Sequence, residues 1–142
     1  MKELVFPFAI ATAFAMMGVD TAVTMLPRAE LSNFFTVDGI EAKRVGKTAH
    51  LKVDRTIHHP IHMSFIVRVQ KRGLNGWTDD CTAPEVGPIL YQPDAELPDP
   101  ITLDWWTWGA CVELPEGPAR IVTTWIPEPN GLSPVTVVSE VE

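Results

Sequence analysis

The sequence lacks the short motifs by which common catalytic sites are recognised. Its 142 residues contain no Gly-x-Ser-x-Gly nucleophile turn, no His-Glu-x-x-His metal-binding helix and no phosphate-binding glycine loop. Asp79 and Asp80 form an acidic pair, but acidic residues on loops are usually solvated, and a glycosidase requires a defined separation of its carboxylates. We therefore predict a non-enzymatic protein without a cofactor.

Positive charge is scarce, with 11 Lys and Arg residues against 18 Asp and Glu residues and a formal net charge of −7. Residues 28–72 are basic on balance, whereas residues 73–142 are acidic and contain Arg120 as their single cation. A modest basic stretch without interleaved aromatic residues argues against nucleic-acid binding. The two parts are expected to complement each other within one fold, or to form a dipolar surface that orients a partner.

A long apolar segment begins the chain. Residues 4–19 carry no charge and follow Lys2, which is typical of a secretory signal, and residues 13–15 offer a small-x-small cleavage site. If the segment continues to Leu26, a helix of roughly 34 Å could cross a hydrocarbon core of about 30 Å, with Asp20 toward its outer end. Residues 1–26 are thus predicted to be a signal peptide or an N-terminal membrane anchor, and both alternatives stay open.

Either alternative exports residues 27–142, as a periplasmic domain or as one anchored to the inner membrane. No cysteine follows the leader closely and no N-glycosylation sequon occurs, so a bacterial or phage setting is favoured. Cys81 and Cys111 are predicted to form a disulfide, because oxidising compartments preserve such bonds. The alternative is a pair of free or metal-binding thiols, but no neighbouring histidine or second cysteine supports it.

Beyond the leader, short alternating segments separated by turn residues predict strands. Ala49, Leu51 and Val53 alternate with polar residues in one such segment. The glycines at 73 and 76 predict a hairpin that returns residues 77–81 beside a central strand at 63–70. The predicted strands lie at residues 34–37, 40–45, 49–55, 63–70, 77–81, 101–108, 120–126 and 135–141.

Residues 82–100 are predicted to be a long ordered crossover, because their prolines cannot donate to a strand ladder. About seven short strands with Pro and Gly turns predict an all-β fold. We expect an antiparallel sandwich of immunoglobulin or fibronectin III type, preceded by one N-terminal hydrophobic helix. A small barrel is the alternative.

Three segments carry a resemblance to a known group of proteins. They are Val53-Asp54-Arg55-Thr56-Ile57-His58, Leu103-Asp104-Trp105-Trp106-Thr107-Trp108, and the turn and strand from Leu114 to Trp125. Over this part of the chain the sequence resembles small exported immunoglobulin-like proteins of unassigned function from tailed bacteriophages and prophages. The resemblance implies a β-sandwich and no enzymatic activity, although the cysteine placement departs from the antibody pattern.

Three of the five tryptophans lie in the predicted strand at 101–108. Strand alternation would place Trp105 on one face and Asp104, Trp106 and Trp108 on the other. If exposed, the second set forms an acid-flanked aromatic platform suited to a sugar or a protein partner, because Trp is common in binding hot spots. If the proline-rich crossover covers it, the set is a second small core. Asp104, Trp106 and Trp108 are the predicted binding surface.

His58, His59 and His62 form the one cluster of metal-type ligands in the sequence. Imidazoles bind Zn, Cu or Ni, but no cysteine or carboxylate of suitable spacing completes a set. A polar turn between two strands is the alternative interpretation, and we do not predict a metal site.

Three functional hypotheses follow from these features. The leading one is a non-enzymatic exported or membrane-anchored β-sandwich that contacts another protein of the bacterial envelope or of a phage. The second is a glycan-binding module that uses Trp106 and Trp108. The third is a periplasmic metal-handling protein that uses the three histidines.

Overall fold

The computed structural model describes residues 30–128 and 132–142. The predicted leader, residues 1–26, with its hydrophobic helix, lies outside the described residues, so both alternatives for it stay predictions. Within the described ranges, no helix is long and apolar enough to cross a membrane.

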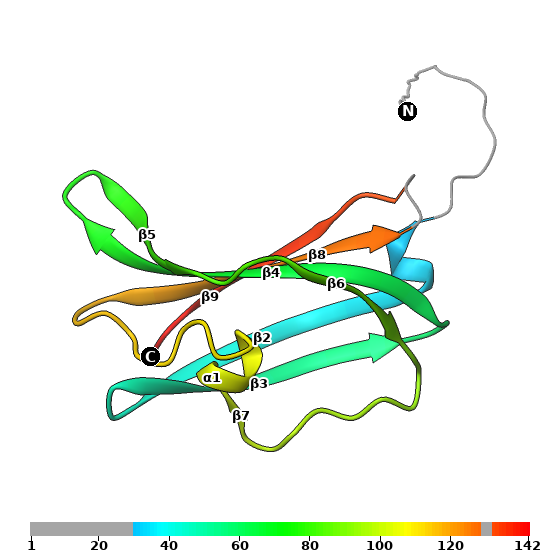
Figure 1. Ribbon diagram of the computed structural model, residues 1–142, viewed down its shortest axis with the longest axis horizontal. Helices are drawn as coiled ribbons and strands as arrows, with labels where there is room; N and C mark the ends of the chain where they lie inside the picture. The colour runs from blue at the N-terminus through cyan, green and yellow to red at the C-terminus, as the bar shows by residue number, and fades with distance from the viewer. Residues whose placement is uncertain (1–29, 129–131) are drawn as a thin grey trace.

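The described residues form an all-β structure of two antiparallel sheets (Figure 1). The smaller sheet has the order β2-β3-β7, with strands β2 (Phe35–Val45), β3 (Thr48–Ile57) and β7 (Ile101–Thr102). The larger has the order β5-β4-β8-β9, with β6 also paired to β4. Its strands are β4 (Ile61–Gly73), β5 (Gly76–Thr82), β6 (Val86–Tyr91), β8 (Ala119–Glu128) and β9 (Val135–Glu140). Two short helical elements are η1 (Leu31–Asn33) and α1 (Leu103–Trp106).

The core lies between the two sheets and follows the alternation of the strands. Met63, Val67 and Val69 of β4 are almost fully buried. Each such side chain stabilises the fold by about 1.5–3 kcal/mol relative to an exposed one. Phe35 of β2 reaches across from the smaller sheet, and its ring centroid lies 5.2 Å from that of Trp125 on β8. Aromatic packing therefore joins the two layers.

Most of the predicted strands are confirmed with longer bounds. The segments 49–55, 63–70 and 120–126 lie within β3, β4 and β8, and β9 covers most of 135–141. The predicted hairpin is also confirmed, because β4 and β5 pair up to Gly73 and Gly76. The two strands predicted at 34–37 and 40–45 are one strand, β2, with an irregularity in its pairing between Val37 and Gly39.

The predicted crossover at residues 82–100 is only partly correct, because its first half contains β6. This strand pairs with the N-terminal part of β4, on the side that β5 occupies farther along. It can do so because β4 extends beyond the end of β5. Pro88 is compatible with such an edge position. Gly87 allows the close approach, since a Cβ there would lie 2.5 Å from the Ser64 Oγ.

The strand predicted at residues 101–108 is wrong. Only Ile101 and Thr102 pair with β3, and the chain then turns into α1. The Thr102 hydroxyl oxygen accepts a hydrogen bond from the Trp105 backbone N–H at 3.1 Å, which caps the helical turn. A local side-chain cap of this kind competes with strand pairing, and here it replaces the alternation that a strand would impose.

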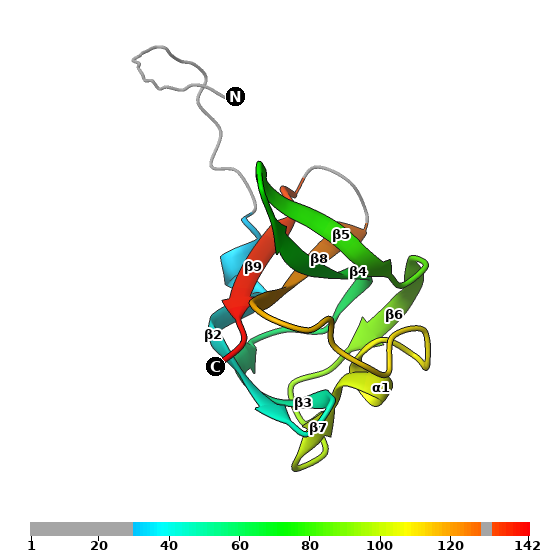
Figure 2. The ribbon, with the colours of Figure 1, turned by 90° about the vertical axis from the view of Figure 1, so that its left-hand side faces the viewer.

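The two sides of the sandwich differ in how they are closed (Figure 2). On one side β2 is joined to the chain that follows β9 by a parallel bridge between Ala42 and Val141. Two further backbone hydrogen bonds flank it, from the Arg44 N–H to the Glu142 oxygen at 2.9 Å and from the Glu142 N–H to the Ala42 oxygen at 3.1 Å. On the other side, within the described residues, β3 and β6 are not paired with each other. Segment 92–100 and α1 connect the sheets there.

The predicted disulfide between Cys81 and Cys111 is confirmed, with an S–S distance of 2.03 Å. It joins the end of β5 to the chain that follows α1. The bond thus attaches the short helix to the larger sheet.

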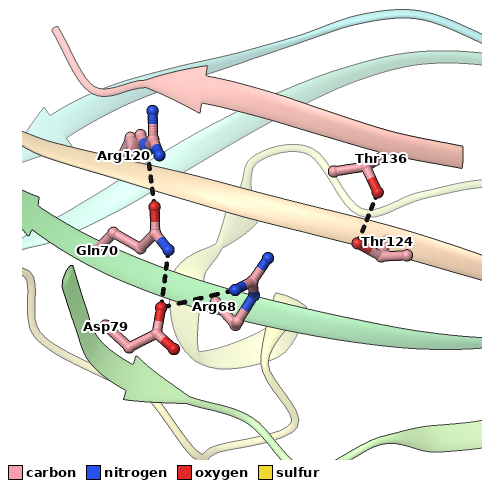
Figure 3. A network of polar contacts seen from close by, with 6 residues as sticks. All are labelled: Arg68, Gln70, Asp79, Arg120, Thr124 and Thr136. Atoms are coloured by element: carbon pink, nitrogen blue, oxygen red, sulfur yellow. Dashed lines mark hydrogen bonds and ion pairs between the residues drawn. The ribbon is translucent and has the colours of Figure 1, made fainter. Parts of the chain in front are cut away.

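A polar network covers part of the outer face of the larger sheet (Figure 3). The Gln70 amide donates to an Asp79 oxygen at 2.7 Å and accepts from the Arg120 Nε at 2.7 Å, and Arg68 lies 3.8 Å from the same Asp79 oxygen. Next to it, the hydroxyls of Thr124 and Thr136 are 2.9 Å apart. Within this network, the Arg68–Asp79 pair joins a basic residue of the first part of the chain to an acidic residue of the second, as one interpretation of the charge distribution expects.

Candidate functional site

A cleft of about 500 Å³ opens on the side of the sandwich where β3 and β6 are unpaired with each other. Its lining comes from β3, β4, β6 and β8, from residues 95–97 of the crossover, and from α1 with the turn that follows it. Most of the lining is apolar and aromatic. Its charged side chains are Arg55, Glu96 and Asp104.

The turn after α1 is held by a buried threonine. The Thr107 hydroxyl lies 2.8 Å from the Leu103 carbonyl oxygen and accepts a hydrogen bond from the Cys111 N–H at 3.0 Å. Cys111 is itself buried and bonded to Cys81. The wall of the cleft is therefore attached to the core at its base.

Trp108 has a left-handed backbone conformation, with φ of 57°, and is followed by Gly109 at 82°. Such a conformation costs a bulky residue about 1–2 kcal/mol and is normally given to glycine at a helix end. Strain of this kind is common at functional sites. In this conformation the Trp108 indole lines the cleft and stays exposed to solvent.

The three neighbouring tryptophans have different environments. Trp105 is 52% exposed and Trp108 is 63% exposed, whereas Trp106 is only 3% exposed. The Trp106 indole N–H donates to the Thr123 hydroxyl at 3.1 Å, and its ring lies 6.2 Å from that of Trp125. Trp105 and Trp108 are thus the solvent-facing indoles, and Trp106 forms part of the floor.

These positions correct the prediction that Asp104, Trp106 and Trp108 share one face opposite Trp105. All four side chains line the cleft. The strand-based division fails because residues 103–106 form a helical turn, in which Trp106 points into the core. Trp105, which the alternation separated from the predicted surface, belongs to it.

Arg55 is a charged residue of the cleft that the sequence interpretation missed. It follows Val53 by two positions on β3 and precedes Ile57 by two, so it occupies the phase of the inward-facing residues. Its guanidinium carbon lies 5.6 Å from the centroid of the Tyr91 ring. The sequence contained a signal for this position. The predicted alternation of Ala49, Leu51 and Val53, continued by two residues, places Arg55 on the inward-facing side of the strand.

The surroundings of Arg55 and Tyr91 change their acid–base properties in opposite directions. Burial lowers the pKa of the Arg55 guanidinium, and the nearby Tyr91 acts against this. Burial raises the pKa of the Tyr91 hydroxyl, which the charge of Arg55 opposes. The guanidinium remains charged at neutral pH. The cleft therefore holds a partly desolvated cation against an aromatic ring.

The three histidines lie at the other candidate position, around the turn between β3 and β4. His58 Nε2 is 3.4 Å from the Thr36 hydroxyl, His59 contacts the Phe34 ring edge-on at 6.1 Å, and His62 is exposed on β4. Among the described residues, no group of three or more His, Cys, Asp or Glu side chains could hold a metal ion.

Comparisons with protein-family models, with curated proteins and with solved structures find no match to this chain. Functional inference therefore rests on the cleft. Its aromatic walls offer apolar contact, and its three charged side chains offer charge-assisted hydrogen bonds.

Proposed function

We propose that this protein is a non-enzymatic recognition domain that contacts a partner protein through the aromatic cleft. One observation carries the proposal: two tryptophans, Trp105 and Trp108, stay exposed at the rim of a largely apolar cleft, one of them in a strained backbone conformation. Tryptophans that become buried in an interface are frequent hot spots. Clefts of 300–1,000 Å³ are typical binding sites.

The proposal includes the setting expected from the sequence. The domain is an exported sandwich of immunoglobulin or fibronectin III type, periplasmic or anchored in the inner membrane through residues 4–26, and it acts at the bacterial envelope or in a phage. The antiparallel two-sheet arrangement, the disulfide and the apolar leader support this setting. The resemblance to exported phage proteins supports it as well.

Photocrosslinking in the cells that naturally produce the chain tests the proposal. A crosslinking amino acid replaces Leu90, which lines the cleft and is 44% exposed, or Val138, which is 50% exposed on β9 outside the cleft. We expect a protein adduct from position 90 that is lost when Trp105 and Trp108 are both replaced by alanine. An equal adduct from position 138, an adduct that survives the double replacement, or no adduct from position 90 contradicts the proposal.

Glycan binding is the second candidate, and the two exposed indoles beside Asp104 favour it. A sugar ring stacks on an indole while a carboxylate accepts hydrogen bonds from its hydroxyls. The mainly apolar lining makes this candidate weaker, because a sugar needs many polar partners. Binding to a glycan array or to peptidoglycan that disappears in both Trp105→Ala and Trp108→Ala would favour it over a protein partner.

A further inference from the structure

We infer that Arg55 is the anion-binding residue of the cleft and that the cleft receives the last residue of a partner chain, an apolar residue with a free carboxylate. This inference rests on the proposed function and specifies the chemistry of the partner. It depends on the position of Arg55, on the absence of a carboxylate within 4.0 Å of its guanidinium among the described residues, and on the size and apolar lining of the cleft.

The position of Arg55 is unusual for a charged residue. Its neighbours in the same phase of β3 are Leu51, Val53 and Ile57, which face the core. Arg55 is half-buried and its guanidinium packs over the Tyr91 ring, whose centroid lies 6.0 Å from that of Phe35 in the core. A guanidinium at such a position loses part of its hydration, and the face of the Tyr91 ring offers it a cation–π contact.

No carboxylate within the described ranges compensates this charge. The two ion pairs there are Arg68–Asp79 and Lys71–Asp80, and both lie away from the cleft. Glu96 and Asp104 line the same cleft, but neither is within 4.0 Å of the Arg55 guanidinium. Burial also lowers the pKa of Arg55, which agrees with a guanidinium that lacks a counter-ion. Because Arg55 is half-buried, a carboxylate that enters the cleft can make charge-assisted hydrogen bonds with its guanidinium that no described residue makes.

The surroundings define the rest of the ligand. Most of the side chains that line the cleft together with Arg55 are aromatic or aliphatic, including Ile89, Leu97 and Trp106. A terminal residue places its carboxylate and its apolar side chain on one Cα, so both fit into a cleft of about 500 Å³ that the crossover and the α1 turn bound. Capture of a C-terminal carboxylate is an established mode of peptide recognition. An arginine fork suits it because two N–H groups can bind the two oxygens.

An NMR titration of the complete folded domain tests the inference. The probes are N-acetylphenylalanine, its neutral amide, and N-acetyl-glutamyl-phenylalaninamide, which carries an internal carboxylate beside the same side chain. The indole N–H signals of Trp105 and Trp108 report binding. We expect the free acid to bind about tenfold more tightly than either other probe, because hydrogen bonds between charged groups contribute more than those between neutral groups.

Variants then assign this preference to Arg55. In Arg55→Gln the acid and the amide are expected to bind equally, whereas Arg55→Lys retains part of the preference. Arg68→Gln, on the outer face of the larger sheet, is the matched control and leaves it unchanged. Glu96→Gln is expected to strengthen binding of the acid, because it removes a like charge from the cleft.

Several results would overturn the inference. They are equal binding of acid and amide by the unmodified domain, a preference that persists in Arg55→Gln, equal binding of the internal carboxylate, and no response of the tryptophans to any probe. Equal binding of acid and amide at the tryptophans removes the role of Arg55 and leaves the recognition domain in place. The crosslinking experiment decides the proposed function separately.

Discussion

The two sides of this sandwich solve the same structural problem in different ways. Where β2 meets β9, backbone hydrogen bonds close the sheets, and the nearby Ala42 is small and buried. Where β3 faces β6, side chains and a loop do so, and a cleft of about 500 Å³ remains. Unpaired strand edges invite unwanted association, so proteins usually pair or cover them. The side where β2 meets β9 is therefore the one whose backbone hydrogen bonds stabilise the fold.

The unpaired side contains features that fold stability does not explain. Trp108 is strained, Arg55 has no counter-ion in the described part of the chain, and Trp105 and Trp108 face solvent. Each costs free energy in the isolated domain. The proposed partner would bury the two indoles and pair with Arg55.

Removing the disulfide should have the largest effect. For Cys81→Ala with Cys111→Ala, the chain-entropy estimate for a separation of 30 residues is a loss of about 3.5 kcal/mol in the free energy of unfolding. Chemical denaturation measures this loss. Hydrogen exchange should show that the loss of the disulfide accelerates exchange more in residues 103–114 than in β2 and β9. Uniform acceleration in both regions would argue against two sides of different stability.

Adding a methyl group at Gly87 should have the second largest effect. A Cβ there would lie 2.5 Å from the Ser64 Cα, and the φ of 143° is unfavourable for alanine, so Gly87→Ala should lose about 1–3 kcal/mol. The clash of the added methyl group with Ser64 is expected to separate β6 from β4 and to abolish binding in the cleft. Gly39→Ala in β2 is the control, because no atom lies within 4 Å of its Cβ position. Equal losses in the two variants would refute this account of β6.

Relieving the strain at Trp108 should increase stability slightly and reduce recognition. Asparagine adopts the left-handed conformation more readily, so Trp108→Asn should raise the free energy of unfolding by up to about 1 kcal/mol. The same variant should form less crosslinked adduct. Trp105→Asn, at a helical position without positive φ, should lose adduct without gaining stability. A Trp108→Asn protein less stable than Trp105→Asn would show that the strain is not relieved.

The pH dependence of Tyr91 should give the smallest effect. Burial raises the pKa of this hydroxyl above its ordinary value of 10.0, so the unfolded chain loses the proton first as pH rises. The stabilising contribution is therefore complete below about pH 10 and is lost as pH rises through the folded pKa. Because the chain has one tyrosine, tyrosinate absorbance reports it directly. A midpoint at or below 10 in the folded domain would contradict the packing around Tyr91.

Much of the larger pattern could be predicted from the sequence. The strands at 49–55, 63–70 and 120–126 and the hairpin after Gly73 follow from local alternation and turn residues, and the cysteine pair follows from their number and the expected export. The candidate site was predicted only in part. The tryptophan segment was recognised, but its conformation was not, because the Thr102 cap and the buried Thr107 outweigh the alternation of that segment.

For the segments at 49–55, 63–70 and 120–126, the amino-acid sequence alone determined which side chains face the core, since side-chain alternation along a strand is local. It also determined the presence of an inward-phase cation at position 55. Only the tertiary structure decided that a Gly-Pro segment pairs as β6, because that pairing depends on how far β4 extends past β5. The tertiary structure also decided where the cleft forms. Its walls come from segments distant in the chain, and their meeting depends on which sheet edges remain unpaired once all other strands have found partners.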